Sequence, residues 1–314
     1  MLSLMLGVGV GIILPMQTAI NSRLRMVVDS AFISSMISFT VGTIFLIFGS
    51  FITAGSLTVS KNVIVHQPWW IWIGGLLGVI YLTGNIILFP YLGSVQTVII
   101  PVLGQIIMSM LIDNYGWFAS PTHSLTVTRV IGAILVFVGV LFAVALPKLL
   151  QTTKFKDSPV KVQPTGANWL WRMTGILTGA LSAVQTAING HLSVIIHSAI
   201  KAAFISFLVG TLTLWLIVII KERKISFRRL HLKNTVWWNW CGGVLGAFFV
   251  CVNAYLVPII GTGMVVVILL IGTIAGSLLV DHFGLFASKK NPVNLLQVIG
   301  IVIMITGVSM IKLL

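Results

Sequence analysis

The chain has 314 residues, of which 58% are hydrophobic and only 8% are charged. Because soluble domains usually contain about 25% charged residues, this composition and a mean hydropathy of +1.10 exclude a soluble globular protein. The net charge of +14 does not indicate a nucleic-acid partner, because the Lys and Arg residues lie between long apolar segments, where they set the topology of a membrane protein.

Ten segments are long and apolar enough to cross a bilayer, which takes about 20 residues. Five lie in the first half of the chain, at residues 2–21, 31–53, 69–88, 95–112 and 127–146, and five in the second, at residues 170–189, 199–220, 237–256, 263–280 and 295–313. The polar stretch 148–168 between them contains two prolines and a glycine and predicts a linker. We therefore expect an all-α membrane protein with five-helix repeats at residues 1–147 and 169–314.

The two halves are copies of each other. Displacing the sequence by 168 residues aligns them without a gap, so that the segment Gln17 to Asn21 matches Gln185 to Asn189, Asn85 matches Asn253 and Asp113 matches Asp281. Such self-similarity indicates a fused duplication. Because each copy has an odd number of spans, the second copy must cross the membrane in the opposite sense.

The basic residues support an inverted orientation. Fifteen of the 19 Lys and Arg residues fall on one side of the predicted topology; the exceptions are Lys61, Arg129, Lys201 and Lys312. Positive residues are enriched in cytoplasmic loops. The richer side, with the linker, is thus predicted to be cytoplasmic and both termini to lie outside. Inverted repeats are common in secondary transporters, whose sites lie near the membrane midplane.

Uncharged polar residues are the candidate functional groups within the predicted spans. Gln17 and Asn21 are four residues apart and share a helix face, and Gln185 and Asn189 repeat that face. Pro15 precedes the first pair and is expected to kink the helix. An unpaired amide in hydrocarbon costs several kcal/mol, so these side chains either join helices or contact a substrate. The glycine pairs Gly74 with Gly78 and Gly242 with Gly246 indicate close helix packing.

Further amides occupy matching positions later in each repeat. Asn85 and Asn253 each precede a proline by five residues, at Pro90 and Pro258. With the predicted inversion, Gln17, Asn21 and Asn85 lie in the cytoplasmic half of the membrane and their three counterparts in the outer half. Gln105 is expected near the midplane and is the leading candidate for a central substrate contact. Its counterpart is Thr273.

Two aspartates begin matching motifs at the ends of spans. Asp113 and Asp281 each open the pattern Asp-x2-Gly-x-Phe-Ala-Ser. Either they form equivalent gates with a cation such as Arg129, or they order the tight glycine turn that follows. Pro15 is a third gating candidate.

The sequence offers little for catalysis. No acidic residue lies in the middle of a predicted span, and the six His residues are not at metal-ligand spacing on any one helix. We expect no enzyme activity, no metal and no cofactor.

The combined motifs resemble the YdcZ-type family of the drug/metabolite transporter superfamily. The matching residues are Gly11, Pro15, Gln17, Asn21 and Leu24, then Ser38, Phe39, Gly42 and Thr43, then Gly74, Gly75 and Gly78, and finally Asp113 and Gly116; all but Pro15 recur in the second half. The resemblance implies a fused ten-helix carrier that transports small organic molecules, often by export. The superfamily's small multidrug carriers have a proton-binding glutamate in the first helix. Here Gln17 is the nearest polar group, so the resemblance does not extend to proton coupling.

These observations together predict a multi-pass carrier of the bacterial inner membrane that exports a small organic solute by alternating access between two inverted repeats. The expected substrate contacts are Gln17, Asn21, Asn85, Gln105, Gln185, Asn189, Asn253 and Thr273. Lipids and the solute are the expected partners, and the fused chain is expected to act alone or as a dimer. The alternatives are a membrane scaffold or assembly subunit, in which the amides only pack helices, and a channel or lipid flippase.

Overall fold

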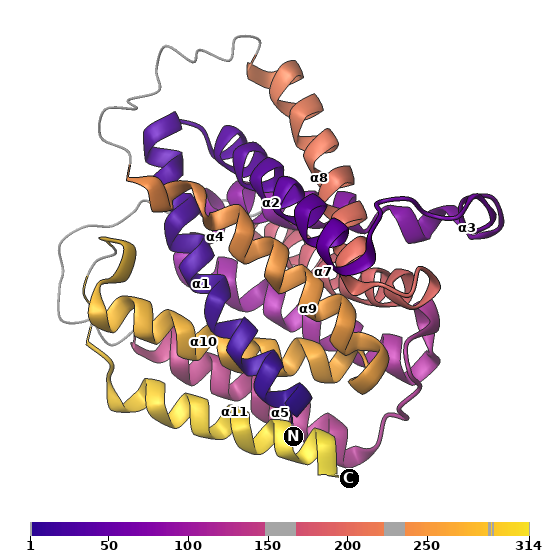
Figure 1. Ribbon diagram of the computed structural model, residues 1–314. Helices are drawn as coiled ribbons and strands as arrows, with labels where there is room; N and C mark the ends of the chain where they lie inside the picture. Colours follow the sequence, from indigo (N-terminus) through magenta and orange to yellow (C-terminus); the bar gives the residue numbers. More distant parts are fainter. Residues whose placement is uncertain (1, 148–167, 223–235, 288–289, 291, 314) are drawn as a thin grey trace.

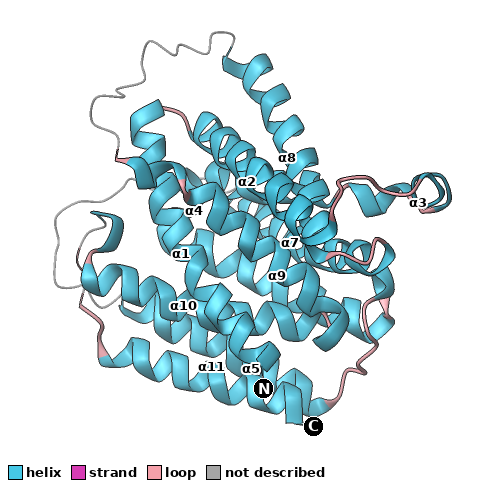
Figure 2. Ribbon diagram, in the orientation of Figure 1, coloured by secondary structure: helices cyan, strands magenta, loops and turns pink. Residues whose placement is uncertain are grey.

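The computed structural model describes residues 2–147, 168–222, 236–287, 290 and 292–313. Within these ranges the chain is helical, with short turns and no strand (Figure 2). Nearly all of the expected linker, residues 148–167, lies outside the described residues.

The first half contains five α-helices joined by short connections. They are α1 (Leu2–Val28), α2 (Ala31–Ala54), the short α3 (Lys61–His66), α4 (Gly74–Tyr115) and α5 (Val127–Val140), which continues as a π-helical turn over Leu141–Ala145. Ser30 caps the start of α2, where its Oγ accepts a hydrogen bond from the Ile33 N–H at 3.3 Å. Gly55 ends the same helix with a φ of 64°, a conformation that favours glycine.

The second half contains α7 (Asn168–Ile195), α8 (Ala199–Glu222), α9 (Gly242–Ile260), α10 (Thr262–Phe283) and α11 (Leu295–Leu313). Short 3₁₀ turns at Trp69–Trp72 and Trp237–Trp240 precede α4 and α9 at equivalent places. Only Gly261 separates α9 from α10. Its φ of 81° and ψ of 159° turn the chain sharply.

Eight helical segments among the described residues are long and apolar enough to cross a membrane. They are Leu2–Val28, Ala31–Thr53, Val98–Tyr115, Val127–Ala145, Ala199–Lys221, Gly242–Ile260, Thr262–Phe283 and Leu295–Lys312. This result confirms an all-helical membrane protein. The number of segments is two fewer than the ten spans expected. Helix α7 is not among the eight, and the apolar helical stretch Gly74–Gly84 is shorter than a membrane span.

The expected interruption between residues 88 and 95 is absent, since the helix α4 is continuous over 42 residues. It is nevertheless strongly bent. Leu77 and Ile112 belong to one buried cluster, although 35 residues of straight helix would span about 52 Å. A Cβ atom at Gly175 would lie 2.9 Å from Ile100 Cγ2 and 3.6 Å from Leu88 Cδ1. The two helices expected here are therefore two arms of one bent helix, both packed on α7, and Pro90 lies in the stretch that joins them.

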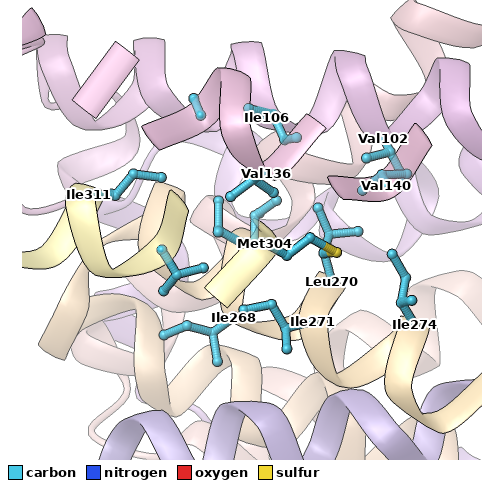
Figure 3. Close-up of a cluster of buried hydrophobic side chains, with 14 of the residues drawn as sticks. Val102, Ile106, Val136, Val140, Ile268, Leu270, Ile271, Ile274, Met304 and Ile311 are labelled. Atoms are coloured by element: carbon cyan, nitrogen blue, oxygen red, sulfur yellow. The ribbon is translucent and has the colours of Figure 1, made fainter. Parts of the chain in front are cut away.

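The helices pair across the two halves (Figure 1). Helix α2 packs on α8 and helix α5 on α11, while α1 crosses α9 and α10. A large buried cluster joins α5, α10 and α11, in which Met304 lies near Val136 and Leu270 (Figure 3). Many large apolar side chains are exposed, among them those of Ile52, Leu216 and Val302, as expected for a protein whose surface contacts lipid.

Contacts between the halves are reciprocal. Gly42 lies against Phe207 and Gly210 against Phe39, and the two aromatic rings stack with their centroids 4.8 Å apart. Likewise Gly132 packs on Gly307, while Gly139 packs on Gly300. For each contact there is a second, equivalent contact whose two residues are displaced by 168 positions from those of the first. Such a pattern is characteristic of two copies related by an approximate two-fold axis.

Candidate functional site

The amides of α1 lie against glycines of the opposite half. Gln17 packs on Gly246 and Asn21 on Gly242, both on α9. A methyl group at Gly246 would overlap Gln17 Nε2, and one at Gly242 would overlap Asn21 Oδ1. These amides therefore fit between the helices because α9 has glycines, which lack a side chain, at both contacts.

The amides of α7 make the equivalent contacts with α4. Gln185 packs on Gly78, where a Cβ atom would lie 2.7 Å from Gln185 Nε2, and Asn189 packs on Gly74. Asn189 also donates from Nδ2 to Ser206 Oγ at 3.2 Å. The structure thus brings four predicted site residues to the interface between halves, as two matched pairs.

Three predicted site residues have a buried carbonyl oxygen without a hydrogen-bond partner among the described residues. These are the Oδ1 atoms of Asn21, Asn189 and Asn253. Asn189 is 2% exposed and Asn253 is 5% exposed. Leaving a buried acceptor unpaired costs about 1–3 kcal/mol. The side chain of Asn85, the counterpart of Asn253, lies outside what the structure describes.

Gln105 and Thr273 occupy matching positions but make different contacts. Gln105, on the second arm of α4, donates from Nε2 to Ser182 Oγ on α7 at 3.1 Å. Ser182 is three residues from Gln185, so Gln105 lies close to the amide pair of α7. Thr273 instead donates to the carbonyl of Leu269 on its own helix at 2.8 Å.

Asp113 joins the end of α4 to the start of α10. Its carboxylate accepts hydrogen bonds from the Thr262 N–H at 2.8 Å, the Gly263 N–H at 2.9 Å and Ser120 Oγ at 3.0 Å. Arg129 Nη2 lies 3.5 Å from Asp113 Oδ2. A carboxylate at a helix N-terminus is stabilised by the unpaired N–H groups and the helix dipole. We call these five residues the Asp113 latch.

The remaining gating candidates are placed differently. Asp281 lies partly buried near the end of α10, and the residue that corresponds to Arg129 in the second half is Gln297. Gln297 Oε1 accepts from the Asn294 N–H at 3.0 Å at the start of α11. Pro15 lies within α1 without ending it, since α1 is helical from Leu2 to Val28.

Sequence reasoning missed several partners at the interface. Ser182, Ser206 and Thr262 were not expected to bond to the candidate amides and aspartate. The glycines were expected only to allow helix packing. The spacing could have indicated the contact between amides and glycines. Gly74 and Gly78 are four residues apart, and so are Gln185 and Asn189. Among the described residues, no group of three or more His, Cys, Asp or Glu is placed to bind a metal.

Comparison with known proteins identifies related proteins over nearly the whole chain. Residues 2–142 and residues 170–310 each match one family, described as "Putative inner membrane exporter, YdcZ". A solved crystal structure of a protein aligns with 99% of this chain and 96% of its own, at a TM-score of 0.65 and 15% sequence identity. That likeness concerns the fold alone. No curated protein matches the chain.

Proposed function

Because this chain belongs to the YdcZ family of the drug/metabolite transporters, we propose that it exports a small organic solute by alternating access. In this proposal the two halves form inverted repeats in the inner membrane and rock about the interface that contains the amides. The eight candidate substrate contacts are those named from the sequence, with Gln105 as the central one.

A ten-span topology is part of the proposal. Eight segments have the length and hydropathy of a span; the first arm of α4 and the helix α7 supply the other two. Two copies of five spans must run in opposite senses. The excess of Lys and Arg on one predicted side supports a cytoplasmic linker and external termini.

The observation that carries the proposal is the reciprocal fit of amides on glycines. Gln17 and Asn21 of α1 pack against α9 of the second half, and Gln185 and Asn189 of α7 pack against α4 of the first. With inverted repeats these two groups lie at mirrored depths, as alternating exposure of one site to two sides requires. Glycine at these contacts permits the helices to slide past the amides.

The chemistry of the amides suggests the kind of solute. The buried Oδ1 atoms of Asn21, Asn189 and Asn253 are hydrogen-bond acceptors that have no partner among the described residues. A solute with hydroxyl, amino or amide hydrogens would satisfy them.

Cysteine accessibility tests alternating access. In a Cys241→Ala/Cys251→Ala background, a cysteine at position 105 is expected to react with an impermeant reagent from each side of the membrane in turn. A cysteine at Ile52, which is 84% exposed on α2, controls for reagent reaching lipid-facing positions. Protection of position 105 from both sides would contradict the proposal.

One observation favours a scaffold as the second candidate. Gln105 bonds to Ser182 and Asn189 to Ser206, so both amides join helices in this structure. A scaffold would keep those bonds permanently. Thermal shift of the purified protein against a panel of metabolites separates the two candidates, because only a carrier has a solute that stabilises it.

A further inference from the structure

The short helix α3 lies apart from the packed helices of the molecule. It follows α2, whose apolar segment ends at Thr53, and precedes the first arm of α4, which begins at Gly74. Figure 1 shows α3 projecting to one side of the helix bundle. A segment that joins the ends of two neighbouring spans lies near a membrane surface. In the proposed topology this is the outer surface.

Packing within the protein does not explain why α3 is helical. The helix has only six residues, Lys61–His66, and none of them is buried against the described part of the chain. Helices shorter than about 12 residues are marginal in water unless packing supports them. A surface outside the described chain is therefore expected to support α3.

The side chains of α3 separate into a polar side and an apolar side. Asn62 and His66 are four residues apart and share one side of the helix. At about 100° per residue, Ile64 lies on the opposite side, and Val63 and Val65 flank it. Ile64 is 55% exposed and Val65 is 75% exposed. A helix of this kind lies in the plane of a bilayer, with its apolar side at the boundary between headgroups and acyl chains.

Exposed apolar residues also flank α3 along the chain. Ile52, near the end of α2, is 84% exposed, and Trp69, just before α4, is 73% exposed. Tryptophan is enriched where a membrane meets water. The apolar side of α3 thus comes between a residue at the end of a span and a residue typical of the membrane interface.

The charges near α3 suit a phospholipid surface. Lys61 begins the helix and is exposed, and residues 55–72 contain no Asp or Glu. Lys201, at the start of α8, donates from Nζ to Ser56 Oγ at 3.3 Å and to the Thr58 carbonyl at 3.5 Å. Ammonium groups at a membrane surface attract anionic headgroups. The two lysines are also two of the four basic residues that fall outside the predicted cytoplasmic set.

We propose that α3 is a lipid anchor, which lies in the headgroup region of the outer leaflet with Ile64 and Val65 among the acyl chains. The bonds of Lys201 connect this anchor to α8, so that the paired helices α2 and α8 are held at a fixed depth. The partner is the phospholipid bilayer and not a second protein. This attachment does not depend on transport, and only its assignment to the outer leaflet rests on the proposed topology.

Fluorescence quenching of single NBD labels tests the anchor. The labels are attached to Asn62→Cys, Ile64→Cys or Val65→Cys in a Cys241→Ala/Cys251→Ala background. The full chain is reconstituted in vesicles of phosphatidylcholine and phosphatidylglycerol. Labels at positions 64 and 65 should emit at shorter wavelength and be quenched by nitroxide-labelled lipid. The label at position 62 should be quenched more strongly by iodide in the buffer.

Two matched aspartate variants show whether the apolar side inserts. With the label at position 65, Ile64→Asp should lower the equilibrium constant for insertion by about tenfold or more, because an isoleucine side chain then leaves the lipid. Asn62→Asp adds the same charge on the polar side and should leave quenching by lipid nearly unchanged. Both residues are exposed, so neither change should disturb the packed helices.

Several results would overturn the proposal. Strong quenching by iodide at all three positions would place α3 in water, and protection from both quenchers would mean that a protein covers it. Equal effects of Ile64→Asp and Asn62→Asp would show that the two sides of the helix do not differ.

Labelling in cells tests the leaflet. In spheroplasts of a bacterium that expresses the protein, an impermeant maleimide should react with Asn62→Cys. Reaction only after the membrane is disrupted would overturn the assignment to the outer leaflet. An inserted α3 in a protein that moves no solute would support the anchor and contradict only the proposed function.

Discussion

The hydroxyl groups of Thr43 and Thr211 lie 2.8 Å apart and are both buried, although 168 residues separate them. Each threonine is the duplicate of the other. A residue that bonds to its own copy must lie close to the axis that relates the copies. The pair therefore marks the centre of the α2–α8 interface, beside the stacked rings of Phe39 and Phe207.

The threonine pair should be energetically coupled. Thr43→Val and Thr211→Val each remove one hydroxyl from a buried bond. In a double-mutant cycle the coupling should be about 0.6 kcal/mol and no more than about 1.7 kcal/mol, as for other hydrogen bonds between membrane helices. Denaturant unfolding in detergent measures it. Thr53→Val, on an exposed residue that bonds only within α2, should show no coupling to Thr211→Val.

Glycines at the closest helix crossings should not tolerate alanine. A Cβ atom at Gly75 would overlap the Ser206 carbonyl oxygen, and one at Gly243 would overlap the Ser38 carbonyl oxygen. Because backbone atoms must then move, Gly75→Ala should destabilise the protein by about 1–3 kcal/mol and lower its Tm. Gly9→Ala is the control, since nothing lies within 4 Å of its Cβ position; a fall in Tm there as large as at Gly75 would contradict the explanation.

Neutralising Asp113 should destabilise the junction between α4 and α10. Asp113→Asn leaves the buried Arg129 charge without its carboxylate, and such a loss typically costs about 3–5 kcal/mol. The double variant Asp113→Asn/Arg129→Gln should recover part of the loss, because no charge then remains unpaired. Tm measurements on the four proteins of the cycle test this; strictly additive effects would show that the two residues do not interact.

The cluster around Met304 should be sensitive to lost volume. Met304 is fully buried between α5 and α10 (Figure 3). Met304→Ala should therefore lower the free energy of unfolding by about 2–5 kcal/mol through lost contacts and a cavity. Met5→Ala removes the same atoms from a residue that is 66% exposed and should have a much smaller effect on unfolding in detergent.

Gln105→Ala separates binding from packing. Loss of the bond to Ser182 should lower stability by only about 0.5–1.5 kcal/mol. If Gln105 contacts the solute, export should fall by at least about tenfold, because about 1.4 kcal/mol of lost binding corresponds to that factor. Ser182→Ala breaks the same bond without removing the amide, and equal export defects in both variants would indicate a packing role.

Much of the fold followed from the sequence. Hydropathy predicted the membrane class, and the 168-residue repeat predicted a duplicated chain with matching residues in its two halves. The expected interruption between residues 88 and 95 was wrong, since α4 is a single bent helix. A proline and a glycine signal that the chain turns, but whether the backbone leaves the helical conformation there depends on local hydrogen bonds and on how both arms pack on α7.

The candidate site was only partly predictable. Residue type and spacing identified Gln17, Asn21, Gln185 and Asn189 as candidates, because burying an unpaired amide in hydrocarbon costs free energy whichever way its side chain points. Their partners lie in the opposite half, and no local pattern in the sequence relates Asn21 to Gly242. The difference between Gln105, which bonds to α7, and Thr273, which bonds to its own helix, likewise required the packed structure.

By itself the sequence determined that this protein is a duplicated helical membrane protein and which polar residues recur in both copies, because both follow from hydropathy and internal repetition. Only the tertiary structure decided that the amides of each half pack on glycines of the other and that Asp113 holds the first N–H groups of α10. Those contacts depend on distances between helices far apart in the chain. Such distances depend on how closely two helix backbones approach each other. A sequence repeat shows that both copies contain the same residues, but it does not show which helices meet.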